Sequence, residues 1–374
     1  MSNPSRIPVY EPNIGEEEIA SVVAALRRGE ISGSFGQSIP EFEAKFAAYC
    51  GCEHGVAVSS GTAALQLAVA AAGVGRGDEV LVSASTNIAT ALAAYHNNAV
   101  PVPVDSEEVT WNLDPDLVEG LITSRTRAII PVHLFGHPAD MDRICAISRH
   151  HNLVVIEDCA ESHGATWRGR MTGSFGDMGC FSFYANKIIT TGEGGMVVTN
   201  DGQLAERLRL LRNLAFGKLR FYHEVAGYNF RMTGYQAAMG LAQLAMIDRF
   251  IADKRRVGHT YNSLLAGTRG LRLPVELPHA LNVYWMYAIK VEPEFGLSRD
   301  ELAARLAQEG IETRTFFCPM NQQPFLRKQE GFRDVPCPVA DRLWERGLYL
   351  PSSKHLDEPT ITRICDAIKG HARA

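Results

Sequence analysis

Residues Gly179–Asn200 read GCFSFYANKIITTGEGGMVVTN and place one lysine, Lys187, between two apolar runs. Both runs, Phe181–Tyr184 and Gly195–Thr199, have the composition of buried strands. A lysine beside buried strands is costly unless its amine is neutral or bonded, and a desolvated amine is also a good nucleophile. On this stretch alone, the more ordinary interpretation is a surface lysine whose stem lies on apolar atoms. The rest of the chain favours the first interpretation.

Composition excludes several classes of protein. The chain has 374 residues, 46% hydrophobic and 21% charged, which is enough for a large core and favours two domains. With a net charge of −5 and no lysine or arginine block, non-specific binding to nucleic acid or membrane surfaces has no electrostatic support. The eight cysteines are scattered without a CxxC pair, which favours reduced thiols in the cytoplasm. The N-terminal MSNPSRIPVYEPN has no apolar core, so no signal peptide is expected.

Strands and helices alternate along the N-terminal half of the chain. This pattern predicts an α/β fold in which helices cover both faces of a mostly parallel sheet. The uncharged stretches 55–75 and 80–104 fit strand–helix–strand units better than membrane spans, because polar turns and prolines interrupt them. Predicted strands are 55–58, 79–83, 100–104, 128–131 and 153–157, and predicted helices are 14–29, 39–50, 63–72, 87–96, 115–122 and 141–150.

After Asn200 the pattern becomes mainly helical. We predict a large domain over residues 1–247 and a smaller α+β C-terminal domain over residues 248–374, with the helix around 237–256 as the hinge. Predicted elements in this part are helices 204–214, 236–261, 299–308 and 360–371 and a strand at 284–291.

Polar groups follow three of the predicted strands, and such strand ends bind ligands in open α/β sheets. Ser59–Thr62 reads SSGT between a strand and a helix, so its amides suit a phosphate, although an ordinary helix cap looks the same. Asp158 ends an apolar strand, where a carboxylate needs either a ligand or a partner such as an arginine. Lys187 is the third group, and Ser182 is another possible phosphate ligand.

A phosphate cup, an acid and a lysine together match the needs of pyridoxal 5′-phosphate (PLP), whose ring nitrogen the acid would keep protonated. Other cofactors fit less well. The glycines of GVGRGDEV precede a strand, so they form no dinucleotide fingerprint. His133 and His137 are four residues apart, but Gly136 and Pro138 break the helix that would aim both at a zinc ion.

Longer motifs resemble the DegT/DnrJ/EryC1/StrS family of PLP-dependent nucleotide-sugar aminotransferases. They are IPVYEP, PVHLFGHPADMD, IEDCAESHGA, FSFYANKIITTGEGGMVVTND, GYNFRMT and LPS at Leu350–Ser352, so the resemblance runs nearly end to end. Within the family, the chain is most similar to GDP-perosamine synthases and related 4-keto-6-deoxysugar 4-aminotransferases. The resemblance implies PLP-dependent transferase fold type I, like aspartate aminotransferase, with a seven-stranded sheet. It also implies a homodimer with shared active sites, and glutamate as the amino donor.

The same resemblance implies roles for single residues. Lys187 matches the Schiff-base lysine, which also shuttles a proton, and Asp158 matches the acid on the pyridine nitrogen. Glu161 falls where the family places a glutamine or glutamate near the phenolic oxygen of the cofactor. The phosphate-binding positions are Gly61, Thr62, Ser182 and Asn229, the last of which reaches the cofactor of the neighbouring subunit.

Two positions depart from the family pattern. Asn87 stands where an aromatic residue usually stacks on the cofactor ring, and Cys318 stands where relatives often have histidine or tyrosine. Related 3-dehydratases carry histidine in place of Lys187, so the lysine favours transamination. Alternatives left open are a 3-keto nucleotide sugar or a cyclitol ketone as substrate, and a non-catalytic PLP-binding regulatory protein, which would lose the lysine or the acid.

Overall fold

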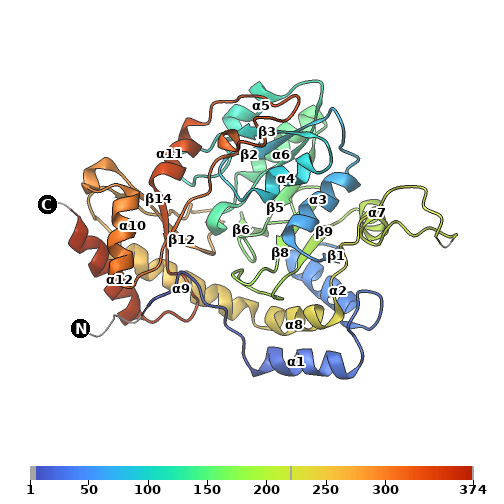
Figure 1. The fold of residues 1–374 in the computed structure, drawn as a ribbon, viewed down its shortest axis with the longest axis horizontal. Helices are drawn as coiled ribbons and strands as arrows, with labels where there is room; N and C mark the ends of the chain where they lie inside the picture. Colours follow the sequence, from blue (N-terminus) through green and yellow to red (C-terminus); the bar gives the residue numbers. More distant parts are fainter. Residues whose placement is uncertain (1–5, 220, 373–374) are drawn as a thin grey trace.

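Short runs rich in valine and isoleucine form the central sheet of the computed structural model, which describes residues 6–219 and 221–372 (Figure 1). The sheet has seven strands in the order β1-β9-β8-β5-β4-β2-β3, and only β9 runs antiparallel to its neighbours β1 and β8. The predicted α/β class with a mostly parallel seven-stranded sheet is therefore confirmed. The strands are β1 His54–Val58, β2 Glu79–Ser83, β3 Val100–Val104, β4 Thr126–Ile130, β5 Val154–Asp158, β8 Met178–Ser182 and β9 Gly195–Thr199.

Both faces of this sheet are buried, so its strands are apolar throughout rather than alternating. Val56 and Val58 pack with the helices α3, α4 and α7 on one face, whereas Ala57 packs on the other face with α2 and α8. The uncharged stretches 55–75 and 80–104 are the units β1–α3 and β2–α4–β3, as predicted. The helices are α2 Ser38–Cys50, α3 Gly61–Ala71, α4 Ala89–Tyr95, α6 Met141–His151, α7 Gly202–Arg212 and α8 Gly234–Ala245.

Among the described residues, no helix is long and apolar enough to cross a membrane. The helix α1 (Glu16–Arg27) lies along α8 at the outer side of the large sheet (Figure 1). Its first turn carries Glu16, Glu17 and Glu18 and its last turn carries Arg27, an arrangement that complements the helix dipole.

The turn between β8 and β9 carries Lys187 and requires two close backbone approaches. A Cβ on Gly195 would lie 2.4 Å from the carbonyl oxygen of Ser60, so only glycine lets the start of β9 approach the start of α3. A Cβ on Gly61 would lie 2.6 Å from Cβ of Ser182. These glycines therefore let the start of α3 lie directly against the end of β8 and the start of β9.

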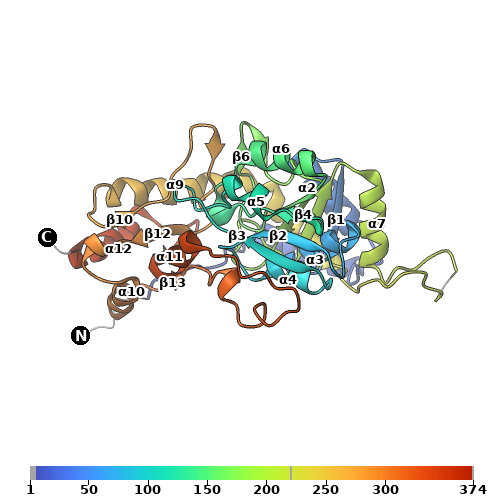
Figure 2. The same ribbon diagram turned by 90° about the horizontal axis from the view of Figure 1, so that it is seen from above.

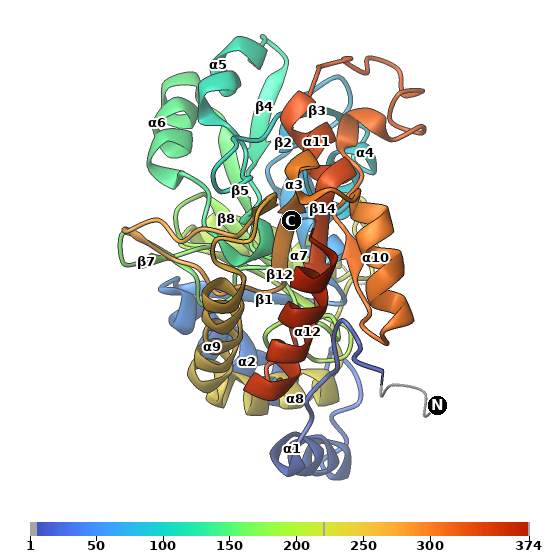
Figure 3. The same ribbon diagram turned by 90° about the vertical axis from the view of Figure 1, so that its left-hand side faces the viewer.

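The C-terminal part is built on a second sheet with the strand order β10-β12-β14-β13. Its strands β12 and β14 are labelled in Figure 3. Tyr261 and Tyr287 stack in its core with ring centroids 4.5 Å apart. The N-terminal segment also joins this part, because the amide of Ile7 donates to the carbonyl of Gly310 at 2.8 Å. The elements are α9 Ile247–Leu265, β10 Leu271–Arg272, β12 Tyr287–Val291, α10 Arg299–Gln308, β13 Arg314–Thr315, α11 Pro338–Arg346, β14 Gly347–Leu350 and α12 Glu358–His371. The division at residue 247 stays a prediction.

Three details of the predicted secondary structure are wrong. The predicted continuous helix 236–261 is two helices, α8 and α9, which meet at Met246 with φ −111° and ψ 6°. No proline or glycine causes this break; α8 packs on α1 and α2 whereas α9 packs on α12, so tertiary packing sets the two directions. The predicted strand 284–291 begins only at Tyr287, because Tyr284 has a positive φ of 48°. The predicted helix 115–122 is a 3₁₀ turn followed by the short helix α5 (Val118–Leu121).

Several short elements lie outside the predicted pattern. The hairpin β6 Thr166–Trp167 and β7 Arg170–Met171 pairs with β11 Ala280–Leu281, which comes from the C-terminal part of the chain. Each of these strands has two residues, which is too short to show a periodic pattern.

Residues 316–337 form a strap that leaves β13 and crosses to the β3 edge of the large sheet (Figures 2 and 3). The side chain of Gln329 donates to the carbonyl of Ala99 at 2.9 Å, and the ring of Phe325 lies 5.3 Å from that of Tyr95. Arg333 then reaches Oε2 of Glu79 at 3.2 Å. The strap therefore ties the C-terminal part to the large sheet.

Glu79 anchors this strap from a fully buried position. Burial raises the pKa of the Glu79 carboxyl. The hydrogen bond from Thr123 and the guanidinium groups of Arg333 and Arg125 outweigh this effect, so the pKa lies below its ordinary value. A carboxyl whose pKa is lowered on folding stabilises the protein above its unfolded pKa and loses that effect as the pH falls.

We therefore expect Glu79→Gln to lower the free energy of unfolding by about 1–3 kcal/mol at neutral pH, because it removes charge-assisted hydrogen bonds at a buried site. The difference from wild type should shrink as the pH falls through the carboxyl pKa. Urea unfolding at several pH values measures this. Glu41→Gln is the matched control, since Glu41 pairs with Lys45 at the surface and its loss should cost at most about 0.5 kcal/mol. Equal losses in both variants would contradict the buried anchor.

Candidate active site

The carboxyl ends of the parallel strands surround a cavity of about 310 Å³. It brings together every predicted site residue except Asn229: Gly61, Thr62, Asn87, Asp158, Glu161, Ser182 and Lys187. Other described residues also line it and are not among the predicted site residues. They include Thr86, Tyr184, Asn186, Glu193, Trp285, Arg314, Phe317 and Tyr349.

The start of α3 forms a cradle at one end of the cavity. The Ser60 hydroxyl accepts a hydrogen bond from the amide of Ala63 at 3.1 Å and caps the helix. The first amides of a helix have no acceptor within it and favour an anion. Gly61 lies so close to Ser182 that a side chain at position 61 would not fit. The Ser182 hydroxyl therefore lies beside the first turn of α3 and lines the same end of the cavity. This end of the cavity fits a phosphate group.

Asp158 ends β5 in the floor of the cavity and is 4% exposed. Its Oδ2 accepts from the hydroxyl of Thr90 at 2.8 Å, and its Oδ1 accepts from the amide of Ala160 at 3.1 Å. Burial raises the pKa of Asp158, and these two hydrogen bonds and the Lys187 amine oppose the rise. No arginine reaches Asp158 among the ion pairs of the described residues, so the alternative of an arginine partner loses its support.

Lys187 and Glu161 also line the cavity, and both are buried. Burial lowers the pKa of Lys187, and the carboxylates of Glu161 and Asp158 oppose this. Burial raises the pKa of Glu161 to about 7, although the Lys187 amine works against it. Oε2 of Glu161 accepts from the amide of Phe135 at 2.7 Å. The interpretation of Lys187 as a surface lysine is therefore wrong.

This donor set fits PLP. The cradle suits the phosphate, a buried carboxylate suits a ring nitrogen that carries a proton, and an amine of lowered pKa suits covalent capture of an aldehyde. The parts come from different strands of one sheet edge, so a single planar molecule can contact all of them.

Asn87 and Asn229 lie in different surroundings. Asn87 is exposed at the cavity wall, and its side-chain oxygen accepts from the amide of Ala89 at 3.0 Å. Asn229 is exposed and does not line the cavity of its own chain. Cys318 is half-buried next to Phe317, which lines the cavity whereas the cysteine does not.

A buried cluster of His133, Glu157 and Cys159 lies under the same sheet edge, with possible metal-ligand atoms within 4.8 Å of one another. These groups already have partners. Nε2 of His133 lies 3.1 Å from Oε2 of Glu157, while its Nδ1 accepts from the amide of Ala139 at 3.0 Å. The carboxylate of Glu157 also accepts from the amides of Gly173, Phe175 and Gly176. The cluster holds the loop before β8 in place.

His137 is the second histidine of the His133–His137 pair, and both of its ring nitrogens have partners outside that pair. Its Nδ1 lies 2.8 Å from the carbonyl oxygen of Pro138, and its Nε2 accepts from the amide of Leu277 at 3.3 Å.

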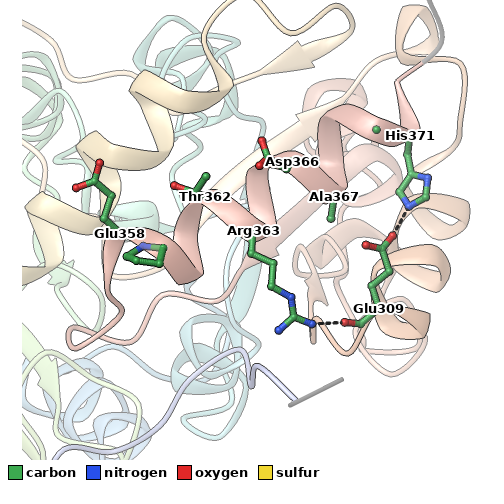
Figure 4. A pocket seen from close by; sticks show the side chains of 9 residues that line it. Glu309, Glu358, Thr362, Arg363, Asp366, Ala367 and His371 are labelled. Atoms are coloured by element: carbon green, nitrogen blue, oxygen red, sulfur yellow. Dashed lines mark hydrogen bonds and ion pairs between the residues drawn. The ribbon is translucent and has the colours of Figure 1, made fainter. Parts of the chain in front are cut away.

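A wider cavity of about 930 Å³ opens on the surface of the C-terminal part, beside α12 (Figure 4). Two of its side chains bond to Glu309: Arg363 donates to the backbone carbonyl of Glu309 at 2.8 Å, and Nε2 of His371 lies 2.7 Å from the Glu309 carboxylate. It holds no lysine and no buried acid, so the chemistry belongs to the smaller cavity.

Comparison with known proteins gives the same result. A model of the DegT/DnrJ/EryC1/StrS aminotransferase family matches residues 12–369. The GDP-perosamine synthase of Caulobacter vibrioides is 43% identical over 371 residues, covering 98% of this chain and 99% of that protein. The dTDP-3-amino-3,4,6-trideoxy-alpha-D-glucose transaminase of Streptomyces venezuelae is 40% identical over 369 residues, covering 97% and 96%. The crystal structure of S. venezuelae DesV in complex with a ketimine intermediate has a TM-score of 0.92 and 39% identity, covering 99% of this chain and 100% of that one.

The match extends over almost the whole chain and includes the segments that form the cavity. The predicted resemblance, the predicted fold type I and the predicted cofactor PLP are confirmed. The chain belongs to the DegT/DnrJ/EryC1/StrS aminotransferase family and is a PLP-dependent sugar aminotransferase.

Proposed function

We propose that this enzyme transfers an amino group from glutamate to the keto carbon of a nucleotide-linked 4-keto-6-deoxy sugar, which yields a 4-amino sugar for polysaccharide, O-antigen or other glycan synthesis. The observation that carries the proposal is one cavity that joins a buried lysine, a buried acid and a phosphate cradle. The choice of sugar draws on the GDP-perosamine synthase that is 43% identical.

We propose that Gly61, Thr62 and Ser182 hold the cofactor phosphate and that Asp158 faces the ring nitrogen. When bound, PLP supplies an aldehyde that carries the amino group and a ring that accepts the electron pair left on the reacting carbon. Glu161 would lie at the phenolic oxygen and, with its pKa raised to about 7, exchange a proton there near neutral pH. Asn87 would border the ring without the area of an aromatic residue.

Lys187 would move the proton of the reaction. Burial lowers its pKa, which favours the uncharged amine that can accept a proton. The amine would take a proton from the substrate carbon at Nζ and return it to the carbon on the other side of the transferred nitrogen. Asp158 would hold a proton between its carboxylate and the ring nitrogen, because an unpaired carboxylate is unfavourable at this buried position.

A 3-keto sugar is the second candidate, because the transaminase of Streptomyces venezuelae named for a 3-amino sugar is 40% identical. The two candidates place the ketone at neighbouring ring carbons. The residues that line the substrate side of the cavity, Arg314, Phe317 and Tyr349, come from the C-terminal part and would decide between them.

A homodimer with shared sites is the state we propose. The segment that follows α7 extends away from the body of the chain (Figures 1 and 2) and exposes large apolar side chains. Single exposed apolar residues are common, but a group on one arm indicates an interface. Asn229 follows this arm and does not line its own cavity, which supports a role in the partner's site. The exposed side chains include Phe216, Leu219, Tyr222 and Val225.

We also propose a cytoplasmic location. All eight cysteines are free, and most are buried, as expected in a reducing compartment.

The substrate can be tested with purified enzyme, PLP, glutamate and a panel of GDP-, UDP- and dTDP-linked 3-keto and 4-keto sugars. We expect 2-oxoglutarate and an amino sugar to form fastest with a 4-keto-6-deoxy sugar. Lys187→Ala is the control and should abolish turnover. Preference for a 3-keto sugar would favour the second candidate, and no turnover with any keto-sugar would contradict the proposal.

Asp158→Asn should keep the fold and lower kcat by a factor on the order of a hundred or more, because an amide cannot stabilise a protonated ring nitrogen by charge. Rates at saturating PLP, together with circular dichroism, measure this. Asp201→Asn is the matched control, because Asp201 caps α7 at the surface and asparagine also caps helices. Turnover within about threefold of wild type would show that Asp158 does not face the ring.

Mixing Lys187→Ala subunits with Asn229→Ala subunits tests the shared site. Each parent should have little activity, and heterodimers should regain one complete site. Mass spectrometry of the intact dimers shows whether subunits have exchanged. Exchange without recovered activity would mean that each site is built within one chain.

A further inference from the structure

The amine of Lys187 lies against an aromatic face. Its Nζ is 3.7 Å from the ring centroid of Trp285. Both side chains are buried, with exposures of 9% and 4%. Among aromatic side chains, the indole face attracts an ammonium most strongly, and the attraction grows when water is excluded.

The indole is fixed in this orientation by hydrogen bonds at its edge and backbone. Its Nε1 donates to the carbonyl of Asn186, the residue before Lys187, at 2.8 Å. The amide of Trp285 donates to the carbonyl of Phe135 at 3.0 Å. Phe135 has a positive φ of 52°, and its own amide bonds Glu161. The ring therefore turns its face to the lysine. The backbone of Phe135, which bonds Trp285, also bonds Glu161.

Charged and titratable groups approach Lys187 from several elements. The carboxylates of Asp158 and Glu161 favour its charged form. Lys254 and Lys354 border the small void behind it together with Tyr10. His163 is neutral at physiological pH, because burial lowers its pKa to about 3. Burial itself favours the uncharged amine, so the charged form of Lys187 needs nearby stabilisation when it carries a proton.

We propose that Trp285 is a positioning residue that holds the free Lys187 amine over its indole face and stabilises the ammonium while it carries a proton between two transfers. This inference rests on the proposed role of Lys187. In the first transfer a C–H bond of the substrate breaks and an N–H bond forms at Nζ. In the second, that N–H bond breaks and a C–H bond forms at the carbon on the other side of the transferred nitrogen, so Lys187 ends as it began.

The enzyme loaded with pyridoxamine 5′-phosphate provides a direct measurement, because Lys187 is then free of the cofactor. Trace labelling with acetic anhydride over a range of pH, followed by peptide mass spectrometry, gives the pH at which half of the Lys187 amine is unprotonated. Lys187 should be labelled in this form and protected in the enzyme loaded with PLP.

Loss of the indole should lower this midpoint, because the ammonium loses stabilisation. We expect a fall of roughly 0.5–1.5 pH units in Trp285→Leu and a smaller fall in Trp285→Phe, which keeps a weaker aromatic face. Tyr184→Leu is the matched control: Tyr184 is an exposed aromatic residue that lines the same cavity, and its loss should leave the midpoint unchanged.

An unchanged or raised midpoint in Trp285→Leu would overturn the proposal, as would an equal fall in Tyr184→Leu. If Trp285→Leu does not fold, Trp285→Phe decides: a lower midpoint supports the proposal and an unchanged one overturns it. Equal labelling of Lys187 in the two cofactor forms would instead show that the proposed function assigns the wrong lysine.

Discussion

The burial of the Lys187 amine beside two carboxylates is the constraint on which the rest of the site depends. A charged amine in this position is unfavourable, and Asp158 and Glu161 only partly compensate for its burial. Each carboxylate is in turn buried and held by backbone or hydroxyl donors, Thr90 and Ala160 on one and Phe135 on the other. Burial shifts the pKa of each group toward its uncharged form, upward for Asp158 and Glu161 and downward for Lys187.

The sheet explains why these groups meet. Six of its strands point their carboxyl ends the same way, and the single antiparallel strand, β9, returns the chain so that the lysine turn lies at that edge. Two glycines permit this return, since side chains on Gly61 or Gly195 would collide with Ser182 or Ser60. The large sheet thus supplies the lysine, the acid and the cradle from segments that are far apart in sequence.

Part of the site could be predicted from sequence, and the physical reason is local. Asp158, Ser182 and Lys187 each adjoin a buried strand, so the cost of burying a polar group makes them stand out. Trp285, Arg314 and Tyr349 carry no such signal, because they come from the C-terminal part and reach the cavity only through tertiary packing. The break at Met246 was missed for a similar reason: its cause is the packing of α8 and α9 against different neighbours, which no residue at the break encodes.

The strap of residues 316–337 has a consequence for altering the enzyme. It begins beside Phe317 at the cavity and ends on the outer edge of the large sheet, where Gln329 and Arg333 hold it to Ala99 and Glu79. Its anchors are thus separate from the lysine, the acid and the cradle. The strap is therefore a segment that can be exchanged between family members. A strap from another member that keeps the two outer anchors would bring new residues to the sugar, while the proton-transfer groups stay in place.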